Sequence, residues 1–594
     1  MCGIAGEFQF NKKNVPLLNL QKVLLRQFNR GPDDGHIYLT KSLALGHRRL
    51  KIFDLSNLGM QPMVDSDLGL ALVFNGAIYN FTELREILKS KGYSFNSNSD
   101  TEVLLKAYHA WGKDCVHRID GMFAFAIWEQ NTGKLILARD RLGIKPLYYS
   151  ADANYGFKFA STLPALIEFG DVDTSIDRIA LHYYLTFHAV PEPRTILSGV
   201  KKLSPGCLMT VHPDGKIEEE SYWNLKFENT KAEHYRDENY WIKETYEVLK
   251  SATHRQLAAD VPVGILLSGG LDSSLLVAMA SKLGQQEIQT FSIGFDSTHG
   301  EQGDEFLYSN LIASKFNTQH QQMFISNKQL AYSLGNCISA MSEPMLSHDN
   351  IGFYLLSHEV SKHVKVVLSG QGADEIFAGY HWFQNIHVNP ALPSQSAQII
   401  FNKVADRSFK EYQQLVMPDL QTPFHASDFL MKLCEKNNSR NPVDNLLKYE
   451  STFALANGPL CRVDNMTMAA SLEARVPFLD EKMLKLATSM PLKYKLPQGG
   501  KYILKQLGRK MLPKQIVDRP KGYFPVPALK YLEGSTLELM REVLSPENIK
   551  QRGIFNLQAV QSLFTKSEKN FTRSGISKLW QVGLLEYWLQ QHKL

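Results

Sequence analysis

Short apolar or alternating runs separated by turn signals dominate roughly the first 210 residues of the chain. Asn-Gly, Thr-Gly-Lys and Gly-Ile-Lys-Pro sequences interrupt the runs, as hairpins and tight loops would. Helical spacing of apolar positions appears at 81–91 and 101–111. The pattern predicts an α+β domain whose strands pack in layers. The apolar runs lie at 43–55, 69–80, 122–140 and 146–150.

From about residue 241 the pattern changes to helices alternating with strands. A helix is expected at 242–257, and a buried strand then ends in glycines at 269–270 before the next helix. Strands that alternate with helices predict a doubly wound parallel sheet, and the remainder of the chain to Leu594 is expected to be mostly helical. The later strand and helix patterns lie at 288–295, 305–317, 318–325, 354–364 and 365–375.

Length and composition bound the architecture. A chain of 594 residues is too long for one hydrophobic core. The hydrophobic share of 44% and the charged share of 21% are those of an ordinary soluble protein, and a net charge of +5 offers no basis for a nucleic-acid or acidic-membrane partner. We expect a first domain at 1–215, a polar linker at 216–240 and a second domain at 241–594.

The cysteines and the amino terminus indicate the compartment. Six cysteines are scattered without a C-x-x-C pair, so a structural zinc site or a disulfide framework is not expected. The first residues lack a basic segment followed by an apolar one, which is the pattern of a secretory signal. No apolar run reaches the length of about 18 residues that a membrane span needs. The expectation is a cytoplasmic protein without a membrane partner.

Cysteine at position 2 admits two interpretations. A free cysteine is most often a small apolar residue packed in a core. Alternatively, Met1 is removed and Cys2 becomes an amino-terminal nucleophile whose own α-amine serves as the base. Residue 2 alone does not choose between them.

A loop at 266–274, L-L-S-G-G-L-D-S-S, follows a strand and opens a helix. Backbone N–H groups at a helix start, with serine hydroxyls beside them, suit phosphate oxygens. The lysine of a Walker loop is missing, so a site that holds the pyrophosphate of ATP fits better. Asp272 is a candidate Mg²⁺ ligand. The alternative is a glycine-rich turn without a ligand.

A second loop at 367–375, V-L-S-G-Q-G-A-D-E, has the same build. Asp374 is the second candidate metal ligand, although Asp374 and Glu375 could also be a solvated helix start. Ligands of open parallel sheets bind beyond the carboxyl ends of the strands. Both loops are therefore expected to meet at one site.

Seven motifs occur in order along nearly the whole chain: M-C-G-I at 1–4, G-H-R-R-L at 46–50, F-N-G-A-I-Y-N at 74–80, S-D-T-E at 99–102, R-D-R-L-G-I-K-P-L-Y-Y at 139–149, S-G-G-L-D-S-S at 268–274 and S-L-E-A-R-V-P-F-L-D at 471–480. Together they resemble the glutamine-dependent asparagine synthetase family. The resemblance implies an amino-terminal-nucleophile glutaminase domain of layered α/β/β/α build, joined to an α/β ATP-pyrophosphatase domain with a helical carboxy-terminal part. It also implies that Cys2 is the glutaminase nucleophile.

The resemblance implies a role for each residue of the glutamine site. Asn75 and the Gly76 N–H would form the oxyanion hole. Arg49 would bind the α-carboxylate of glutamine, Asp100 would accept from its α-ammonium group, and Ile52 would also contact glutamine.

In the second domain the resemblance implies ATP as substrate, Mg²⁺ as cofactor, and AMP and pyrophosphate as products. Lys501 would stabilise charge at the adenylating centre, and Asp272 and Asp374 would bind the metal. The implied partners are glutamine, ATP and a carboxylate acceptor, linked by an ammonia tunnel, and a homodimer is left open. The residues expected to bind ATP and pyrophosphate are Leu267, Ser268, Gly269, Gly270, Asp272, Ser273, Ser369 and Gly370.

Three features depart from ordinary asparagine synthetases. Ala77 replaces the glutamate of N-G-E-I-Y-N, Gln371 replaces the glutamate of S-G-E-G, and the segment 342–349 differs near the expected acceptor. With 185–195 and 292–306, they resemble the N-acetylglutaminylglutamine amidotransferases, which make a neutral compatible solute.

The acceptor is therefore expected to be N-acetylglutaminylglutamine, with aspartate as the alternative. His348, Asp349 and Gln371 are the candidate acceptor-binding residues, and the 296–305 loop is a further candidate. Two other classes were weighed, a nucleic-acid-modifying enzyme and a non-catalytic homologue. The weak net charge argues against the first, and the intact set of site residues argues against the second.

Overall fold

The computed structural model describes residues 2–10, 15–152, 156–227, 235–297, 300–384, 386, 390–437, 439, 441–519, 526–565, 570–573 and 575–594. Met1 and residues 298–299 of the expected acceptor loop lie outside this set. Within it, no helix combines the length and apolar character needed to cross a bilayer.

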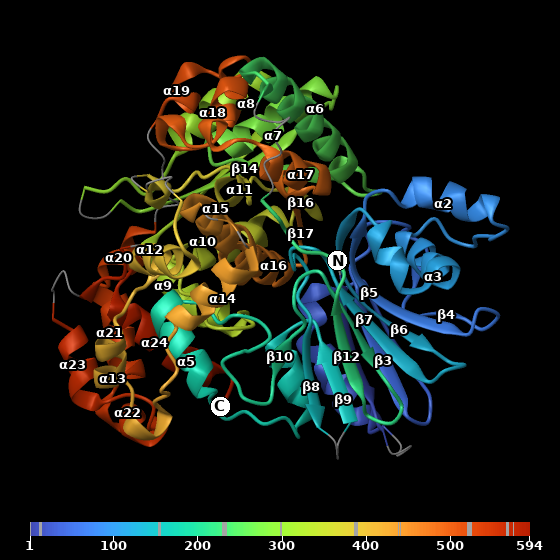
Figure 1. The fold of residues 1–594 in the computed structure, drawn as a ribbon, viewed down its shortest axis with the longest axis horizontal. Helices are drawn as coiled ribbons and strands as arrows, with labels where there is room; N and C mark the ends of the chain where they lie inside the picture. Colours follow the sequence, from blue (N-terminus) through green and yellow to red (C-terminus); the bar gives the residue numbers. More distant parts are fainter. Residues whose placement is uncertain are drawn as a thin grey trace.

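The amino-terminal domain is a sandwich of two antiparallel six-stranded sheets, which lie face to face in Figure 1. The first sheet contains, in spatial order, β10 (Lys201–Lys202), β8 (Tyr148–Asp152), β9 (Gly156–Ala160), β1 (Cys2–Phe8), β3 (Leu43–Arg49) and β2 (Asp34–Leu39). The second contains β12 (Ile217–Ser221), β11 (Cys207–Val211), β7 (Lys134–Arg139), β6 (Gly121–Glu129), β5 (Leu70–Ile78) and β4 (Met63–Asp65).

Successive side chains of each strand point to opposite faces of the sheet, and this alternation builds the layers of the domain. In β6, Ala124 and Ala126 pack between the sheets, while Phe123 and Phe125 pack with the outer helices α2 (Phe81–Ser90) and α3 (Asp100–Trp111). Helix α1 (Leu17–Arg26) buries its apolar face against β1 and β3. The expected α/β/β/α layering is confirmed.

The carboxy-terminal domain contains a five-stranded parallel sheet in the order β15-β14-β13-β16-β17. Helices cover both faces: α6 (Glu238–Leu257), α7 (Leu271–Lys282) and α8 (Phe306–Phe316) pack on one, and α10 (Asp349–Val360) packs on the other (Figure 1). The expected doubly wound sheet is therefore confirmed. Its strands are β13 (Val263–Leu266), β14 (Gln289–Phe295), β15 (Gln319–Ile325), β16 (Val366–Leu368) and β17 (Glu473–Arg475).

The order of the strands decides where a ligand can bind. The chain enters the sheet at the central β13, adds β14 and β15 on one side, and returns to add β16 and β17 on the other. The loops after β13 and β16 leave neighbouring strands at the point where the winding reverses. Such a switch point is where open α/β sheets bind their ligands.

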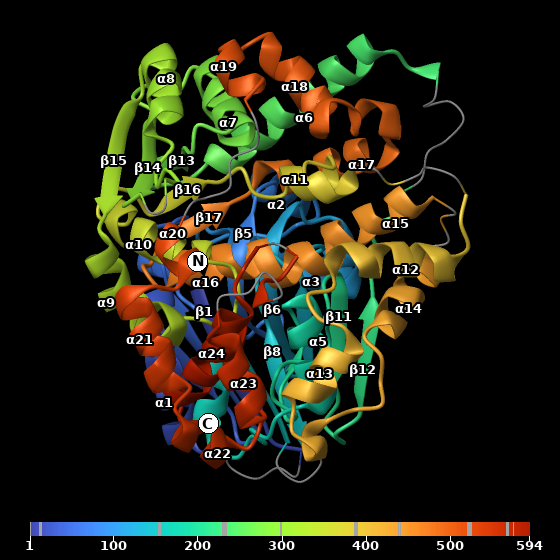
Figure 2. The ribbon, with the colours of Figure 1, turned by 90° about the vertical axis from the view of Figure 1, so that its left-hand side faces the viewer.

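Many helices follow the sheet, as the sequence predicts. Figure 2 shows α16 between the parallel sheet and the amino-terminal sandwich. The remaining helices are α4 (Leu163–Leu166), α5 (Arg178–Phe187), α9 (Asn327–Ser339), α11 (Ala373–Ile376), α12 (Pro393–Val404), α13 (Phe409–Leu415), α14 (Ser427–Asn437), α15 (Pro442–Tyr449), α16 (Cys461–Met468), α17 (Glu481–Ser489), α18 (Tyr502–Arg509), α19 (Lys514–Val517), α20 (Pro527–Tyr531), α21 (Gly534–Val543), α22 (Pro546–Arg552), α23 (Leu557–Leu563) and α24 (Lys578–Gln591).

The range expected to be a linker is structured at both ends. Strand β12 occupies 217–221 and pairs with β11, so the second sheet extends beyond residue 215. Helix α6 starts at Glu238 because Asp237 caps it by accepting from the Tyr240 N–H at 2.8 Å. Residues 228–234 lie outside the described part of the chain.

Candidate active sites

Cys2 begins β1 and lies opposite Arg49 of β3 in the antiparallel register. Its side chain is buried, and its backbone nitrogen donates a hydrogen bond to Asn75 Oδ1 at 3.1 Å. Asn75 belongs to the other sheet, so this bond spans the sandwich. The packing brings the predicted nucleophile and the predicted oxyanion-hole asparagine together, although 73 residues separate them.

The amide nitrogen of Asn75 is an available donor at this position. Asn75 is completely buried, and its Nδ2 has no hydrogen-bond partner among the described residues. Buried donors are rarely left unpaired without a reason. The next residue, Gly76, must be glycine because a Cβ there would lie 2.2 Å from the Met122 carbonyl oxygen. A small acceptor near Cys2 would complete the hydrogen bonding of Asn75.

Arg49 organises the loop that follows its strand. Its Nη1 donates to the Ser56 carbonyl at 2.9 Å, and its Nη2 donates to the Asp54 carbonyl at 2.6 Å. Gly59 permits this close approach, since a Cβ there would lie 2.3 Å from Arg49 Nη2. The loop holds a buried guanidinium group opposite Cys2, where it can attract a carboxylate.

Asp100 is the first residue of α3 and is buried. Its Oδ2 accepts a hydrogen bond from the Ile78 N–H at 3.0 Å. Burial raises the pKa of this carboxyl to about 7, against the lowering effect of that hydrogen bond. An arriving ammonium group would favour the ionised form, as the predicted role requires.

Ala77 and Ile52 belong to an apolar cluster between the two domains. Both are almost fully buried, and the cluster also contains Met122 of the sandwich with Val366 and Met468 of the second domain. The position that carries a glutamate in ordinary asparagine synthetases is therefore packed against hydrocarbon. A glutamate at this position would place its carboxylate in apolar surroundings.

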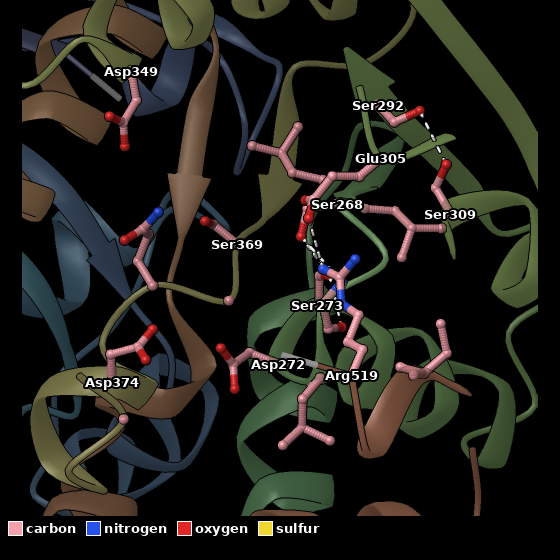
Figure 3. Close-up of a pocket in the computed structure, with 18 of the residues that line it drawn as sticks. Ser268, Asp272, Ser273, Ser292, Glu305, Ser309, Asp349, Ser369, Asp374 and Arg519 are labelled. Atoms are coloured by element: carbon pink, nitrogen blue, oxygen red, sulfur yellow. Dashed lines mark hydrogen bonds and ion pairs between the residues drawn. The ribbon is translucent and has the colours of Figure 1, made fainter. Parts of the chain in front are cut away.

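The loops after β13 and β16 meet in one cavity of about 300 Å³, as the sequence predicts. Figure 3 shows Asp272 and Asp374 pointing toward each other, with Ser268, Ser273 and Ser369 nearby. Most of the residues expected to bind ATP line the cavity: Leu267, Ser268, Gly270, Asp272, Ser273, Ser369 and Gly370.

Gly269 is not among the residues that line the cavity. Its φ of +70° is one that side chains disfavour, and a Cβ there would lie 2.6 Å from the backbone of Tyr308 and Ser309. This glycine lets the loop pack against α8. Backbone packing explains why residue 269 is glycine, and its predicted role in binding ATP stays a prediction.

Lys501 joins the two aspartates of the cavity. Its Nζ lies 2.5 Å from Asp272 Oδ2 and 2.8 Å from Asp374 Oδ1. Burial acts to lower the pKa of Lys501, but the two carboxylates outweigh it and raise the pKa. The lysine is therefore a permanent cation between two acids in a buried place.

Asp272 and Asp374 also fit Mg²⁺. This ion usually binds proteins through one or two carboxylates and completes its shell with phosphate oxygens and water. No cluster of three or more potential metal-ligating side chains occurs among the described residues, so a metal bound by protein alone is not supported. The pair suits an ion that arrives with a nucleotide.

Two of the three residues predicted to bind the acceptor line the cavity. Asp349 and Gln371 line the cavity, whereas His348 does not. The His348 ring packs edge-on against Trp580, with centroids 6.1 Å apart, and burial lowers its pKa to about 4. His348 is therefore an uncharged residue of the packing behind the cavity.

Three cationic residues of the cavity were missed by the sequence analysis: Arg462, Lys505 and Arg519. Arg462 of α16 lies 3.0 Å from Asp349 Oδ2, and its Nη2 donates to Gln371 Oε1 at 3.5 Å. Arg519 pairs with Glu305 at 3.0 Å (Figure 3). No local motif marks Arg462, because the segment 455–468 mixes polar and apolar residues.

Comparisons with known proteins agree with this arrangement. A family model described as asparagine synthase matches residues 244–590, and one described as glutamine amidotransferase domain matches residues 1–223. The chain is 33% identical to glutamine-hydrolyzing asparagine synthetase 1 of Bacillus subtilis strain 168, over 92% of this chain and 90% of that protein. It is 31% identical to asparagine synthetase 3 of the same organism, over 88% and 87%. It is 28% identical to a Penicillium rubens protein named amidase chyE, over 92% and 89%.

Proposed function

Because this chain belongs to the family of glutamine-hydrolysing asparagine synthetases, we propose that it transfers the amide nitrogen of glutamine to aspartate. Membership makes the protein a glutamine-dependent carbon–nitrogen ligase that uses ATP. The acceptor and the residue roles below are the proposal. The observation that carries it is the pair of opposite charges, Arg462 and Asp349, beside both nucleotide loops.

Ammonia is produced at Cys2. After removal of Met1, the Cys2 thiolate attacks the side-chain amide carbon of glutamine, and the α-amine of Cys2 carries the thiol proton to the leaving nitrogen. Asn75 Nδ2 and the Gly76 N–H stabilise the oxyanion. Ammonia leaves, and water hydrolyses the thioester to glutamate. Arg49 and Asp100 hold the α-carboxylate and α-ammonium groups of glutamine.

The acceptor is activated in the cavity of the second domain. Its carboxylate attacks the α-phosphorus of ATP, which forms an acyl-adenylate and releases pyrophosphate. The Ser268 and Ser369 loops bind the pyrophosphate, and Lys501 stabilises the charge that develops on the phosphoryl oxygens. Mg²⁺, held by Asp272 and Asp374, would neutralise phosphate charge. Ammonia then attacks the acyl carbon, which gives the amide and AMP and releases one proton.

Charge complementarity supports aspartate as the acceptor. A free amino acid presents a carboxylate and an ammonium group a few ångströms apart. Arg462 and Asp349 offer one partner for each, and both line the cavity. Their mutual ion pair, at 3.0 Å, would open when the substrate takes their places.

Gln371 favours a second acceptor, N-acetylglutaminylglutamine, whose amidation would give a neutral compatible solute. A neutral side chain lines the cavity where ordinary asparagine synthetases carry glutamate. A blocked dipeptide has no free ammonium group, so it would leave Asp349 without a charged partner. That mismatch is why aspartate is the preferred proposal.

Incubation of the enzyme with glutamine, ATP and each acid separately, followed by mass spectrometry, tests the proposal. Asparagine and AMP are the expected products with aspartate. Amidation of the dipeptide without any asparagine would reject aspartate as the acceptor, and ADP in place of AMP would reject the adenylation step. A matched variant is Asp349→Asn, which should lose asparagine formation and keep the basal glutamine hydrolysis measured without acceptor.

A further inference from the structure

Helix α16 contacts the cavity of the second domain and the amino-terminal domain through two residues that are two positions apart. Arg462 lines the cavity of the second domain, and Asp464 contacts the amino-terminal domain. Each residue of an α-helix is rotated by about 100° from the previous one, so positions two apart point to nearly opposite sides. One short helix can therefore contact the cavity on one side and the amino-terminal domain on the other. Figures 1 and 2 both draw α16 beside the chain's amino terminus.

Asp464 is the centre of a buried ionic cluster across the domain boundary. Its carboxylate accepts from Arg30 Nη1 at 2.8 Å and Nη2 at 3.2 Å, and from Lys145 Nζ at 3.2 Å. The Asp464 side chain is 2% exposed and the Lys145 side chain 1%. Burial acts to raise the pKa of Asp464, but the two cations lower it, so the carboxylate is ionised.

Arg30 continues this cluster to the nucleophile. While its two terminal nitrogens bind Asp464, its Nε donates to the backbone carbonyl of Cys2 at 3.2 Å. The neighbouring residue is tied to the second domain as well, since Ser471 Oγ donates to the Asn29 carbonyl at 2.6 Å. The position of the Cys2 backbone therefore depends on where α16 holds Asp464.

The other side of α16 responds to the acceptor. Substrate binding would draw Arg462 away from Asp349 and Gln371, which hold it in the free enzyme. Two π-helical segments, Glu450–Ala454 and Ala456–Leu460, lie directly before α16. Turns of this kind are rare and occur mostly at functional sites. They make the approach to α16 less regular than an α-helix.

We propose that Asp464 is a positioning residue that couples glutamine hydrolysis at Cys2 to occupancy of the acceptor cavity, through Arg30. Acceptor binding at Arg462 displaces α16, Asp464 carries Arg30 with it, and the Cys2 backbone moves into its productive position. Coupling of this kind needs a contiguous physical link between the two sites, and these contacts supply it. The inference rests on the proposed function, because it requires an acceptor that Arg462 binds.

Glutamine hydrolysis by the full-length enzyme, measured without and with ATP, Mg²⁺ and each of the two acids, tests the coupling. In the wild type at least one acid should stimulate hydrolysis about 5-fold or more, within the usual range of coupling between sites. In Asp464→Asn the stimulation should fall below about twofold, while amidation from added ammonia stays within about twofold of wild type. Glutamate should then form in excess over amide.

Arg30→Lys guards against a variant that merely misfolds. Lysine keeps the charge beside Asp464 but lacks the guanidinium group, whose two terminal nitrogens bind the Asp464 carboxylate while Nε binds the Cys2 carbonyl. In Arg30→Lys the stimulation of glutamine hydrolysis should fall below about twofold, as in Asp464→Asn. Glu586→Gln is the matched control, since Glu586 is a buried carboxylate paired with Arg552 at 2.9 Å and does not line the cavity. It should keep the stimulation.

Three outcomes would overturn the inference: stimulation that survives in Arg30→Lys, stimulation lost equally in Glu586→Gln, or a wild type that neither acid stimulates. Failure of the proposed function is recognised separately. It would appear as absence of any amide by mass spectrometry, whether or not glutamine hydrolysis responds to ATP and acid.

Discussion

The backbone nitrogen of Cys2 donates to Asn75 Oδ1 at 3.1 Å. The amide nitrogen of the same side chain is a buried donor with no hydrogen-bond partner in the described part of the chain. One side chain thus orients the amine of the nucleophile with its oxygen and is free to bind an oxyanion with its nitrogen. Two strands from different sheets must pack to create this arrangement.

Asn75→Ala should lower glutamine hydrolysis by about 10²–10³-fold, because it removes one donor from the oxyanion hole. Cys2→Ala should abolish hydrolysis. Both variants should still amidate the acceptor with added ammonia, measured as AMP release. Loss of ammonia-dependent synthesis in a folded Cys2→Ala protein would contradict two separate sites.

Asp272→Asn should have the opposite effect. Removing one carboxylate from the pair around Lys501 weakens both the proposed metal site and the hold on the lysine. Pyrophosphate exchange into ATP, driven by the acceptor, should fall by at least about 10²-fold, as expected when charge stabilisation is lost. Basal glutamine hydrolysis should be unchanged, and a parallel loss of it would count against the assignment.

Ala77→Glu should destabilise the protein and leave glutamine binding no tighter. The glutamate would enter the apolar cluster of Met122 and Met468, where an unpaired charge costs on the order of several kcal/mol. Thermal unfolding should show a Tm lower by roughly 5 °C or more. Ala77→Gln, of similar volume and without charge, separates overpacking from charge burial. A marked fall in the glutamine KM of Ala77→Glu would show that the missing carboxylate matters.

The raised pKa of Asp100 predicts a pH dependence. Asp100 must be ionised to hold the glutamine ammonium, and its pKa is about 7 in the free enzyme. We expect kcat/KM for glutamine to decrease as the pH falls below about 7. The decrease in kcat should be smaller, because the ammonium group of bound glutamine lowers the pKa of Asp100.

The Asp100 carboxyl affects folding stability in the opposite direction: stability decreases as the pH rises, whereas glutamine binding improves. A buried carboxyl whose pKa is raised binds its proton more tightly in the folded than in the unfolded protein. The stability that it contributes is present at pH below about 4 and is lost as the pH rises to about 7. Asp100→Asn should remove the acidic limb of kcat/KM and flatten the Tm profile over this range. An unchanged limb would assign it to another group.

Arg462→Lys should raise the KM for the acceptor by about 10-fold or more and leave the KM for ATP and glutamine unchanged. Lysine cannot reproduce the planar fork that meets Asp349 and Gln371 and would meet a carboxylate. Initial rates of AMP formation against acceptor concentration provide the measurement. An equal rise in the KM for ATP would place Arg462 at the nucleotide.

The sequence alone determined the layered sandwich, the parallel sheet and the convergence of two Ser-Gly loops. These features follow from local periodicity and from the rule that parallel strands end at one edge, and both are readable in short windows. Cys2, Asp272 and Asp374 were identified for the same reason, because each lies in a compact motif.

Which charged side chains meet depends on how distant parts of the chain pack together. Arg30 and Asp464 are 434 residues apart, and Lys501 and Asp272 are 229 apart. His348 lies next to Asp349 in the chain yet outside the cavity, and Ala77 packs against Met468 of the other domain. Local patterns report which face of an element is apolar, whereas pairing between distant elements depends on how the domains dock. That docking places one helix, α16, between the two sites.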